Sequence, residues 1–187
     1  MSFAPDTVVL ALGSNPFIPD IKGIVKNIKE GKVVDYRDVL VGEKRIGFKI
    51  IVIGGGYIGC ETALFLAERG KDVTLVFRSL EPALDVLYPD NRVSLLKKLK
   101  ESQVKFEAGI KEYKEITPKG ITFIDKTGNE AFWEVDNIVL STGDIPDKTL
   151  FKLLTGKVSD LYQVGDCVEV NRILEAIHGG AITALEI

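Results

Sequence analysis

The feature that most constrains this chain is a cluster of glycines between a predicted strand and a predicted helix. Residues 49–53, KIIVI, are apolar and mostly β-branched, and residues 58–69 carry apolar side chains at helical spacing up to Gly70, a residue type that often ends helices. Between them, residues 54–59 are GGGYIG, which fits the pattern G-x-G-x-x-G. Because another apolar strand follows at 72–77, the order predicts a nucleotide-binding βαβ unit.

Each glycine of the pattern has a physical task in such a unit. Gly54 permits the tight turn, Gly56 lets the backbone approach a pyrophosphate, and Gly59 lets the helix pack closely on the strand. The helix N-terminus offers N–H groups and the positive end of its dipole to the phosphates. We therefore expect residues 54–59 to bind the pyrophosphate of a nicotinamide dinucleotide. The alternative is a glycine-rich turn that serves packing alone.

The end of the second strand bears on the choice between NAD and NADP. An acidic side chain there would hold the adenosine ribose of NAD, but this position is Phe77. The next residue, Arg78, carries a guanidinium suited to a 2′-phosphate, which favours NADP. The alternative is a solvated Arg78, with NAD held by backbone groups alone.

Composition and charge limit the possible partners. The chain has 187 residues, 45% of them hydrophobic, which suits one domain or two small ones. A formal net charge of -3 offers no basic face for nucleic acid. No apolar run approaches the ~20 residues that span a bilayer and the start lacks a signal-peptide pattern, so we expect a cytoplasmic protein without a membrane partner.

Cys60 and Cys167 lie far apart without a C-x-x-C motif, which indicates buried hydrophobic residues and no dithiol or metal site.

Strands dominate the rest of the predicted chain. Continuous apolar runs indicate strands buried on both faces, whereas alternation between 111 and 134 indicates an antiparallel meander. Residues 22–42 are expected to form a polar connector. The expected strands are 7–14, 33–34, 104–106, 137–141 and 161–164, and the expected helices are 91–101 and 172–186. The predicted fold class is α/β, a Rossmann-like three-layer nucleotide-binding domain with a parallel sheet and an antiparallel β-meander.

Four stretches together resemble a known family. They are GGGYIGCE at 54–61, LSTG at 140–143, VGD at 164–166 and RILEAIH at 172–178. They are similar to the two-dinucleotide flavoprotein reductases of the pyridine nucleotide-disulfide oxidoreductase superfamily. The ending is especially similar to the C-terminal region of 2,4-dienoyl-CoA reductases, 2-enoate reductases and NADH:flavin oxidoreductases of the trimethylamine dehydrogenase type. The resemblance spans nearly the whole chain.

This resemblance implies a domain plan. A NAD(P)-binding domain, residues 44–136, would be inserted into a truncated FAD-type domain whose remaining pieces are 1–43 and 137–187. The first glycine motif of the FAD domain and the upstream barrel and iron–sulfur domains would be missing, so we expect a fragment that is inactive alone and doubtful as an FAD binder. Its partners would be the upstream domains of the parent enzyme. Strands near Val8 and Tyr162, left without a central partner, would expose apolar edges, which favours homo-oligomers.

The resemblance also assigns individual residues. Gly165 and Asp166 would meet FAD, and Gly143 would approach the NAD(P). Tyr57 would lie at the nicotinamide pocket and Glu61 would help to hold the nicotinamide. As alternatives, Asp166 could cap a turn, Tyr57 could be a surface aromatic residue and Glu61 an ordinary helix carboxylate. The candidate cofactor-binding residues are Gly54, Gly55, Gly56, Tyr57, Ile58, Gly59, Glu61, Phe77, Arg78, Gly143, Gly165 and Asp166.

The leading functional hypothesis is an NAD(P)H:flavin oxidoreductase, in which the nicotinamide gives a hydride to the flavin N5. We assign no catalytic side chain and no metal ligand, because the single histidine, His178, has no visible carboxylate partner. A non-catalytic NAD(H) sensor is the alternative, although it would not need the pair Gly165 and Asp166. A short-chain dehydrogenase would need Y-x-x-x-K, and none of the five tyrosines has a lysine at that spacing.

Overall fold

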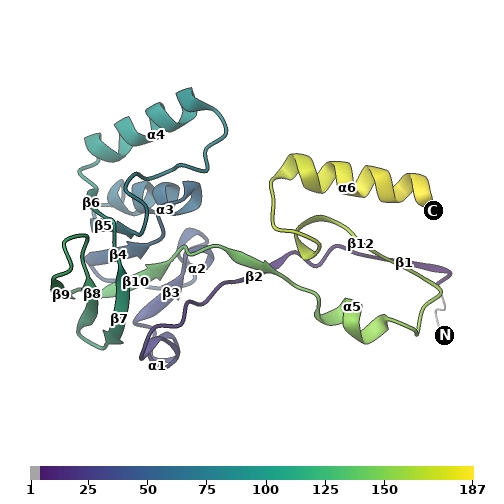
Figure 1. The fold of residues 1–187 in the computed structure, drawn as a ribbon, viewed down its shortest axis with the longest axis horizontal. Coiled ribbons are helices and arrows are strands. Elements are labelled where there is room, and N and C mark those ends of the chain that lie inside the picture. The colour runs from purple at the N-terminus through teal and green to yellow at the C-terminus, as the bar shows by residue number, and fades with distance from the viewer. Residues whose placement is uncertain (1–4) are drawn as a thin grey trace. The chain divides into compact units, whose positions relative to one another are not determined.

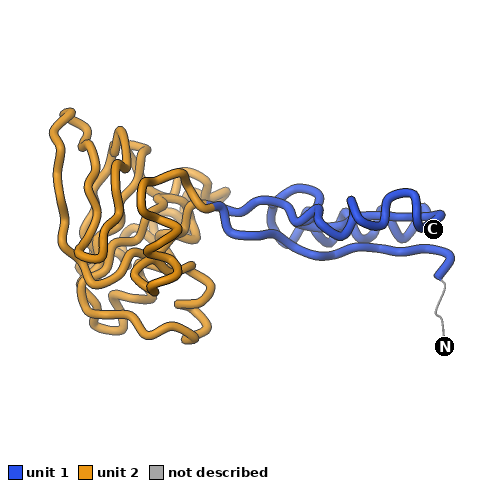
Figure 2. The backbone as a smooth tube through the Cα atoms, turned by 90° about the horizontal axis from the view of Figure 1, so that it is seen from below, with its two compact units in different colours: residues 1–17, 143–187 blue, residues 18–142 orange. Residues whose placement is uncertain are grey.

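The computed structural model describes residues 5–187, whose helices and strands are drawn in Figure 1. The chain divides into two compact units, shown in different colours in Figure 2. The larger unit is residues 18–142, and the smaller one combines the described residues up to 17 with residues 143–187. No helix within residues 5–187 is long and apolar enough to cross a bilayer.

A five-stranded sheet in the order β3-β10-β4-β5-β6 forms the centre of the larger unit. Every pairing in it is parallel. Parallel neighbours need crossover connections, which α3 and α4 supply between β4 and β5 and between β5 and β6. The bounds are β3 Val33–Asp35, β10 Asn137–Leu140, β4 Lys49–Ile53, β5 Asp72–Phe77, β6 Lys105–Ala108, α3 Tyr57–Ala67 and α4 Pro89–Glu101. The predicted βαβ unit is therefore present.

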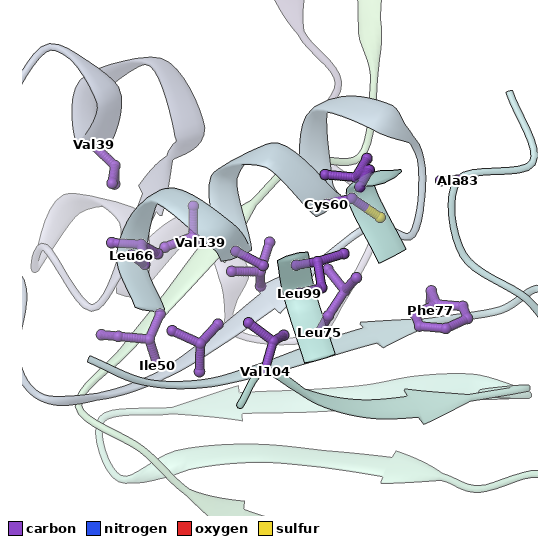
Figure 3. Close-up of a cluster of buried hydrophobic side chains, with 14 of the residues drawn as sticks. Val39, Ile50, Cys60, Leu66, Leu75, Phe77, Ala83, Leu99, Val104 and Val139 are labelled. Atoms are coloured by element: carbon purple, nitrogen blue, oxygen red, sulfur yellow. The ribbon is translucent and has the colours of Figure 1, made fainter. Parts of the chain in front are cut away.

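Two apolar clusters cover the two faces of this sheet, because successive side chains of a strand point to opposite faces. Ile50 and Val52 of β4 belong to the cluster shared with α3 and α4 (Figure 3). Ile51 and Ile53 belong to the other cluster, which includes Phe123. This second cluster is closed by the short helix α1 and an antiparallel meander, the third layer of the fold. The bounds are α1 Ile24–Lys29, β7 Glu112–Thr117, β8 Gly120–Ile124 and β9 Glu130–Glu134.

The segment 22–42 has more regular structure than the polar connector expected from the sequence, although β3 confirms the short strand expected at 33–34. It contains α1, then β3, then a second short helix, α2 (Tyr36–Leu40). Asn27 of α1 is buried, and its side-chain amide donates to the carbonyl oxygens of Gly23 (2.8 Å) and Ile116 (3.0 Å). This side chain of α1 thus binds a carbonyl oxygen 89 residues away in sequence, a contact that the sequence pattern does not reveal.

The compact unit is also larger than the segment 44–136 that the sequence assigned to the NAD(P)-binding domain. The physical reason is strand pairing, because β3 and β4 lie on either side of β10 in one sheet. Residues on both sides of the expected insertion therefore share a core with the glycine turn. The assignment of the pieces to NAD(P)- and FAD-type domains remains a prediction.

Two small sheets form the smaller unit. β1 pairs in parallel with β12, and β2 pairs antiparallel with β11. The run expected as one strand at 7–14 is divided, because Gly13 has φ 74° and turns the chain between β1 and β2. Among the described residues no third strand joins β1 and β12. The bounds are β1 Thr7–Leu10, β2 Ser14–Pro16, β11 Asp144–Pro146, α5 Thr149–Leu154, β12 Asp160–Gln163, the 3₁₀ turn Gly165–Cys167 and α6 Ile173–Glu186.

Candidate functional site

The glycine turn joins the end of β4 to the start of α3. Gly54 has φ 127°, a conformation that L side chains rarely adopt, and its N–H donates to the carbonyl oxygen of Val76 (3.0 Å). A Cβ on Gly54 would lie closer than 3.0 Å to the carbonyl oxygen of Ser141, just after β10. The tight turn expected at this glycine is therefore present, and only glycine fits it.

The other glycines of the turn are closely packed as well. A Cβ on Gly59 would overlap the carbonyl oxygen of Gly54, and one on Gly55 would lie 2.6 Å from Cβ of Phe77. Gly56 is the N-cap of α3, and a Cβ there would face the carboxylate of Asp85, 3.2 Å from Oδ2. The glycines thus bring the start of α3 onto the ends of β4 and β5.

The N-terminus of α3 already binds an anionic side chain. Within the helix, the first hydrogen bond runs from Cys60 N to the carbonyl oxygen of Gly56 (3.0 Å). The three N–H groups before Cys60 therefore have no acceptor within the helix. One of them, Tyr57 N, donates to both oxygens of Asp85, at 2.8 Å for Oδ1 and 3.1 Å for Oδ2. A carboxylate is favoured there by the helix dipole. The site where the sequence predicts a pyrophosphate therefore accepts an anion.

Asp85 belongs to the connection between β5 and α4, residues 78–88, named here the β5–α4 loop. Ala83 anchors this loop, because its N–H donates to the carbonyl oxygen of Gly55 (2.6 Å) and its side chain is completely buried. Arg92 holds the same segment, donating from Nε and Nη2 to the carbonyl oxygen of Pro82 (both 3.1 Å). Sequence reasoning did not identify Asp85. The one sequence feature that could have indicated Asp85 is its place as an acidic residue in the loop after β5.

A buried hydroxyl lies beside the turn. Ser141 is 8% exposed, and its Oγ has no hydrogen-bond partner among residues 5–187. This oxygen lies 3.5 Å from the place that a Cβ on Gly59 would take. A buried donor without a partner is uncommon, and it is consistent with a polar group that is absent from the structure.

Cys60 lies under the same turn. Its side chain is completely buried, and Sγ lies 3.7 Å from the carbonyl oxygen of Gly55. Burial, reinforced by the charge of Asp85, raises the pKa of the Cys60 thiol to about 12. The thiol stays protonated at neutral pH, as expected of a small buried side chain. Cys167 is also a buried free thiol.

The two residues that bear on ribose specificity have different surroundings. Phe77 is 3% exposed and meets Phe106 edge to face, with ring centroids 6.4 Å apart, so it supports the turn and offers no ribose acceptor. Arg78 is exposed, and its guanidinium lies 5.8 Å from the ring centroid of Tyr113. Tyr113 in turn donates its hydroxyl to the carbonyl oxygen of Val76 (3.2 Å). A guanidinium is thus available at the end of β5.

Tyr57 and Glu61 share a groove of about 410 Å³ between α3 and α4. Asn91 and Lys98 of α4 line its other side. Ile58 lies in the same first turn and is half-exposed. The structure therefore brings these three predicted residues to one exposed helix end, next to the glycine turn. Contact with a nicotinamide stays a prediction for Tyr57 and Glu61, and contact with the cofactor stays one for Ile58.

Gly143, Gly165 and Asp166 belong to the smaller unit and are described within it. Gly143 and Gly165 have φ values of 93° and 70°, which other residues rarely adopt. Asp166 Oδ1 accepts a hydrogen bond from Asn171 N (3.3 Å). This hydrogen bond is the kind expected of a side chain that caps a turn, which is the alternative given above for Asp166. The predicted contacts with FAD and NAD(P) remain predictions.

Comparison with known proteins gives consistent matches over the whole chain. A family model described as pyridine nucleotide-disulphide oxidoreductase matches residues 2–181. The chain is 35% identical over 191 residues to an NADH oxidase of Thermoanaerobacter brockii, covering 100% of this chain and 28% of that protein. It is 32% identical over 181 residues to a cinnamate reductase of Clostridium sporogenes, covering 94% and 25%. A solved complex of 2-naphthoyl-CoA reductase superposes with TM-score 0.89 at 31% identity, covering 98% of this chain and 27% of that one. The chain spans about a quarter of the length of these curated relatives.

Proposed function

The chain belongs to the pyridine nucleotide-disulphide oxidoreductase family, and from this premise we propose that it binds NAD(P)H at the glycine turn and positions it for hydride transfer to a flavin. The observation that carries the proposal is the helix N-terminus at Tyr57, which holds an anion at a turn where Gly54 and Gly59 leave no room for side chains.

Membership of this family confirms several predictions made from the sequence. The resemblance, the α/β Rossmann-type fold class, and NAD(P) and FAD as the cofactors of the family are confirmed. The relatives are named as oxidase and reductases, so the family is enzymatic. The activity of this chain alone, and its need for the upstream domains of a parent enzyme, are proposals.

The side chains and backbone around the turn fit a dinucleotide. Gly56 has an ordinary φ of −73°, and a Cβ on it would point towards the place that the Asp85 carboxylate occupies. The absence of a side chain on Gly56 leaves room for an anion at that place. The Ser141 hydroxyl supplies a buried polar group without a partner among the described residues. Arg78 supplies a cation at the end of β5 for the ribose side of the nucleotide. We propose that these groups hold the pyrophosphate and a 2′-phosphate, which favours NADP.

The chemistry would belong to the cofactors, with a nicotinamide that supplies a hydride and a flavin that accepts it. The task of this chain is then to bind and orient. We propose that Tyr57, Ile58 and Glu61 border the nicotinamide, and that Gly143, Gly165 and Asp166 serve the NAD(P) and FAD contacts implied by the family.

Calorimetric titration of the chain with NADPH, NADH and FAD tests the proposal. We expect a saturable exothermic response to NADPH, a weaker one to NADH and little response to FAD. Binding of a nucleotide with no flavin effect in the full-length protein would favour the sensor alternative. If neither nicotinamide nucleotide binds, the proposed function is wrong.

A further inference from the structure

We propose that Asp85 occupies the position of the dinucleotide pyrophosphate in the free protein, so that nucleotide binding requires this carboxylate to leave the N-terminus of α3. The inference rests on the proposed function, because it names the group that the nucleotide displaces. It makes Asp85 an internal competitor that sets the affinity of the site.

Both groups would use the same donor. Tyr57 N, the first N–H of α3, donates to Oδ1 and Oδ2 of Asp85 at 2.8 and 3.1 Å. Oδ2 also lies 3.2 Å from the place of a Cβ on Gly56, the glycine expected to admit the pyrophosphate. Two anions cannot share one N–H and one such gap, because they repel each other and each needs the donor.

The carboxylate leaves part of the site unused. The Ser141 Oγ, beside Gly59, remains without a hydrogen-bond partner in the described part of the chain. Asp85 satisfies the first N–H of the helix but not this hydroxyl. A pyrophosphate has more oxygen atoms than a carboxylate, so it can reach donors that Asp85 does not. A ligand that bound both the Tyr57 N–H and this hydroxyl would make a contact that the Asp85 carboxylate does not make.

The loop also permits an exchange. Ala83, the residue two before Asp85, is fixed by its hydrogen bond to Gly55 O and has a left-handed backbone at φ 54°. Beyond it the chain is open to solvent, and the side chains of Leu84, Asp85 and Leu87 are exposed. Because the carboxylate already borders water, rotation of its side chain can free the helix end while Ala83 stays in place.

Competition predicts two opposite effects of removing the carboxylate. Asp85→Ala loses a contact that exists only in the free protein, so its melting temperature without ligand should fall. The same variant should bind nucleotide about tenfold more tightly, because the internal occupant no longer has to be displaced. Asp85→Asn keeps the size of the side chain and loses the charge. Its melting temperature and its nucleotide affinity should both lie between those of the unchanged chain and those of Asp85→Ala. A residue that only caps α3 would lower stability without any gain in affinity.

The test uses the full chain, isothermal titration and three probes. NADPH and ADP-ribose carry the pyrophosphate and should both bind Asp85→Ala about tenfold more tightly than they bind the unchanged chain. Adenosine lacks the pyrophosphate and should bind both proteins alike. Asp90→Ala is the matched control, because Asp90 is an exposed acidic residue at the start of α4, five positions further along the chain. It should change each affinity by less than about twofold.

The outcomes separate the inference from the proposed function. If the unchanged chain binds NADPH and Asp85→Ala binds it no more tightly, the inference is wrong and the proposed function stands. An equal gain in Asp90→Ala would mean a general charge effect and would also overturn the inference. If no variant binds NADPH or ADP-ribose, both the inference and the proposed function are wrong. In a supporting result, the amide NMR signal of Tyr57 moves on Asp85→Ala and again on addition of ADP-ribose.

Discussion

The carbonyl oxygen of Gly54 lies so close to the Cα of Gly59 that no side chain fits between them. We predict that Gly59→Ala destabilises the larger unit by about 2 kcal/mol, because a methyl group would push α3 off the turn. Elsewhere in a helix the same change is favourable by up to ~1 kcal/mol. Gly180 of α6 has open space around it and serves as the control. Urea unfolding followed by circular dichroism should show opposite signs for the two variants, and equal effects would contradict the packing role of Gly59.

Arg78 should decide between the two nicotinamide nucleotides. We predict that Arg78→Ala weakens NADPH binding about tenfold or more, because a charge-assisted hydrogen bond to the 2′-phosphate is lost. NADH has no such phosphate, so its affinity should change little. Arg69→Ala removes the same charge at an exposed position after α3 and is the control. Equal losses for NADPH and NADH, or a preference of the unchanged chain for NADH, would contradict the assignment.

Asp136 should make the larger unit sensitive to acid. Its carboxylate Oδ2 accepts hydrogen bonds from the N–H groups of Lys49 (2.8 Å) and Phe48 (2.7 Å), and these hold the pKa of Asp136 below its usual value. A lowered pKa in the folded state stabilises the protein above the unfolded value, and this stabilisation is lost as the pH falls through the folded one. Asp136→Asn should therefore melt at a lower temperature than the unchanged chain at pH 7.

The difference between these two proteins should shrink as the pH falls through the lowered pKa of the Asp136 carboxyl, because protonation removes the charge that asparagine lacks. Asp20→Asn changes the same charge at an exposed position of the same unit and should have little effect at either pH. Trp133, the single tryptophan, packs edge to face on Phe123 at 5.0 Å and reports the melting of this unit. A gap between Asp136→Asn and the unchanged chain that persists undiminished at low pH would contradict the role of the Asp136 charge.

Local chemistry explains which parts of the fold were predictable. Apolar runs rich in β-branched residues predict the strand that ends at Ile53 and the strand that ends at Phe77. The glycine motif between them predicts the turn, because its glycines are close together in the sequence. The short helix around Asn27 was not predicted, because it has only six residues and the NH2 group of its buried amide donates to the distant Ile116 carbonyl oxygen. Propensity is a weak prior for such short helices, and tertiary contacts decide them.

The same contrast holds within the candidate site. The motif predicts Gly54, Gly56 and Gly59, because the task of each one requires a position without a side chain. It does not predict Asp85, whose position depends on the fold of a nonperiodic loop and on the left-handed backbone of Ala83. Loop residues gain their roles from the scaffold that places them, so their roles become visible only in the structure.

Titration of Gly56→Leu with NADPH tests the central claim most directly. Gly56 has φ −73°, which leucine adopts without strain, and the one neighbour that its Cβ would meet is the flexible, exposed side chain of Asp85. The variant should therefore keep its circular dichroism spectrum and lose NADPH binding by at least about 30-fold, because the leucine side chain fills the pyrophosphate position. Gly180→Leu, in open space on α6, should bind like the unchanged chain. A folded Gly56→Leu variant that binds NADPH with undiminished affinity would contradict the assignment of the glycine turn as the dinucleotide site.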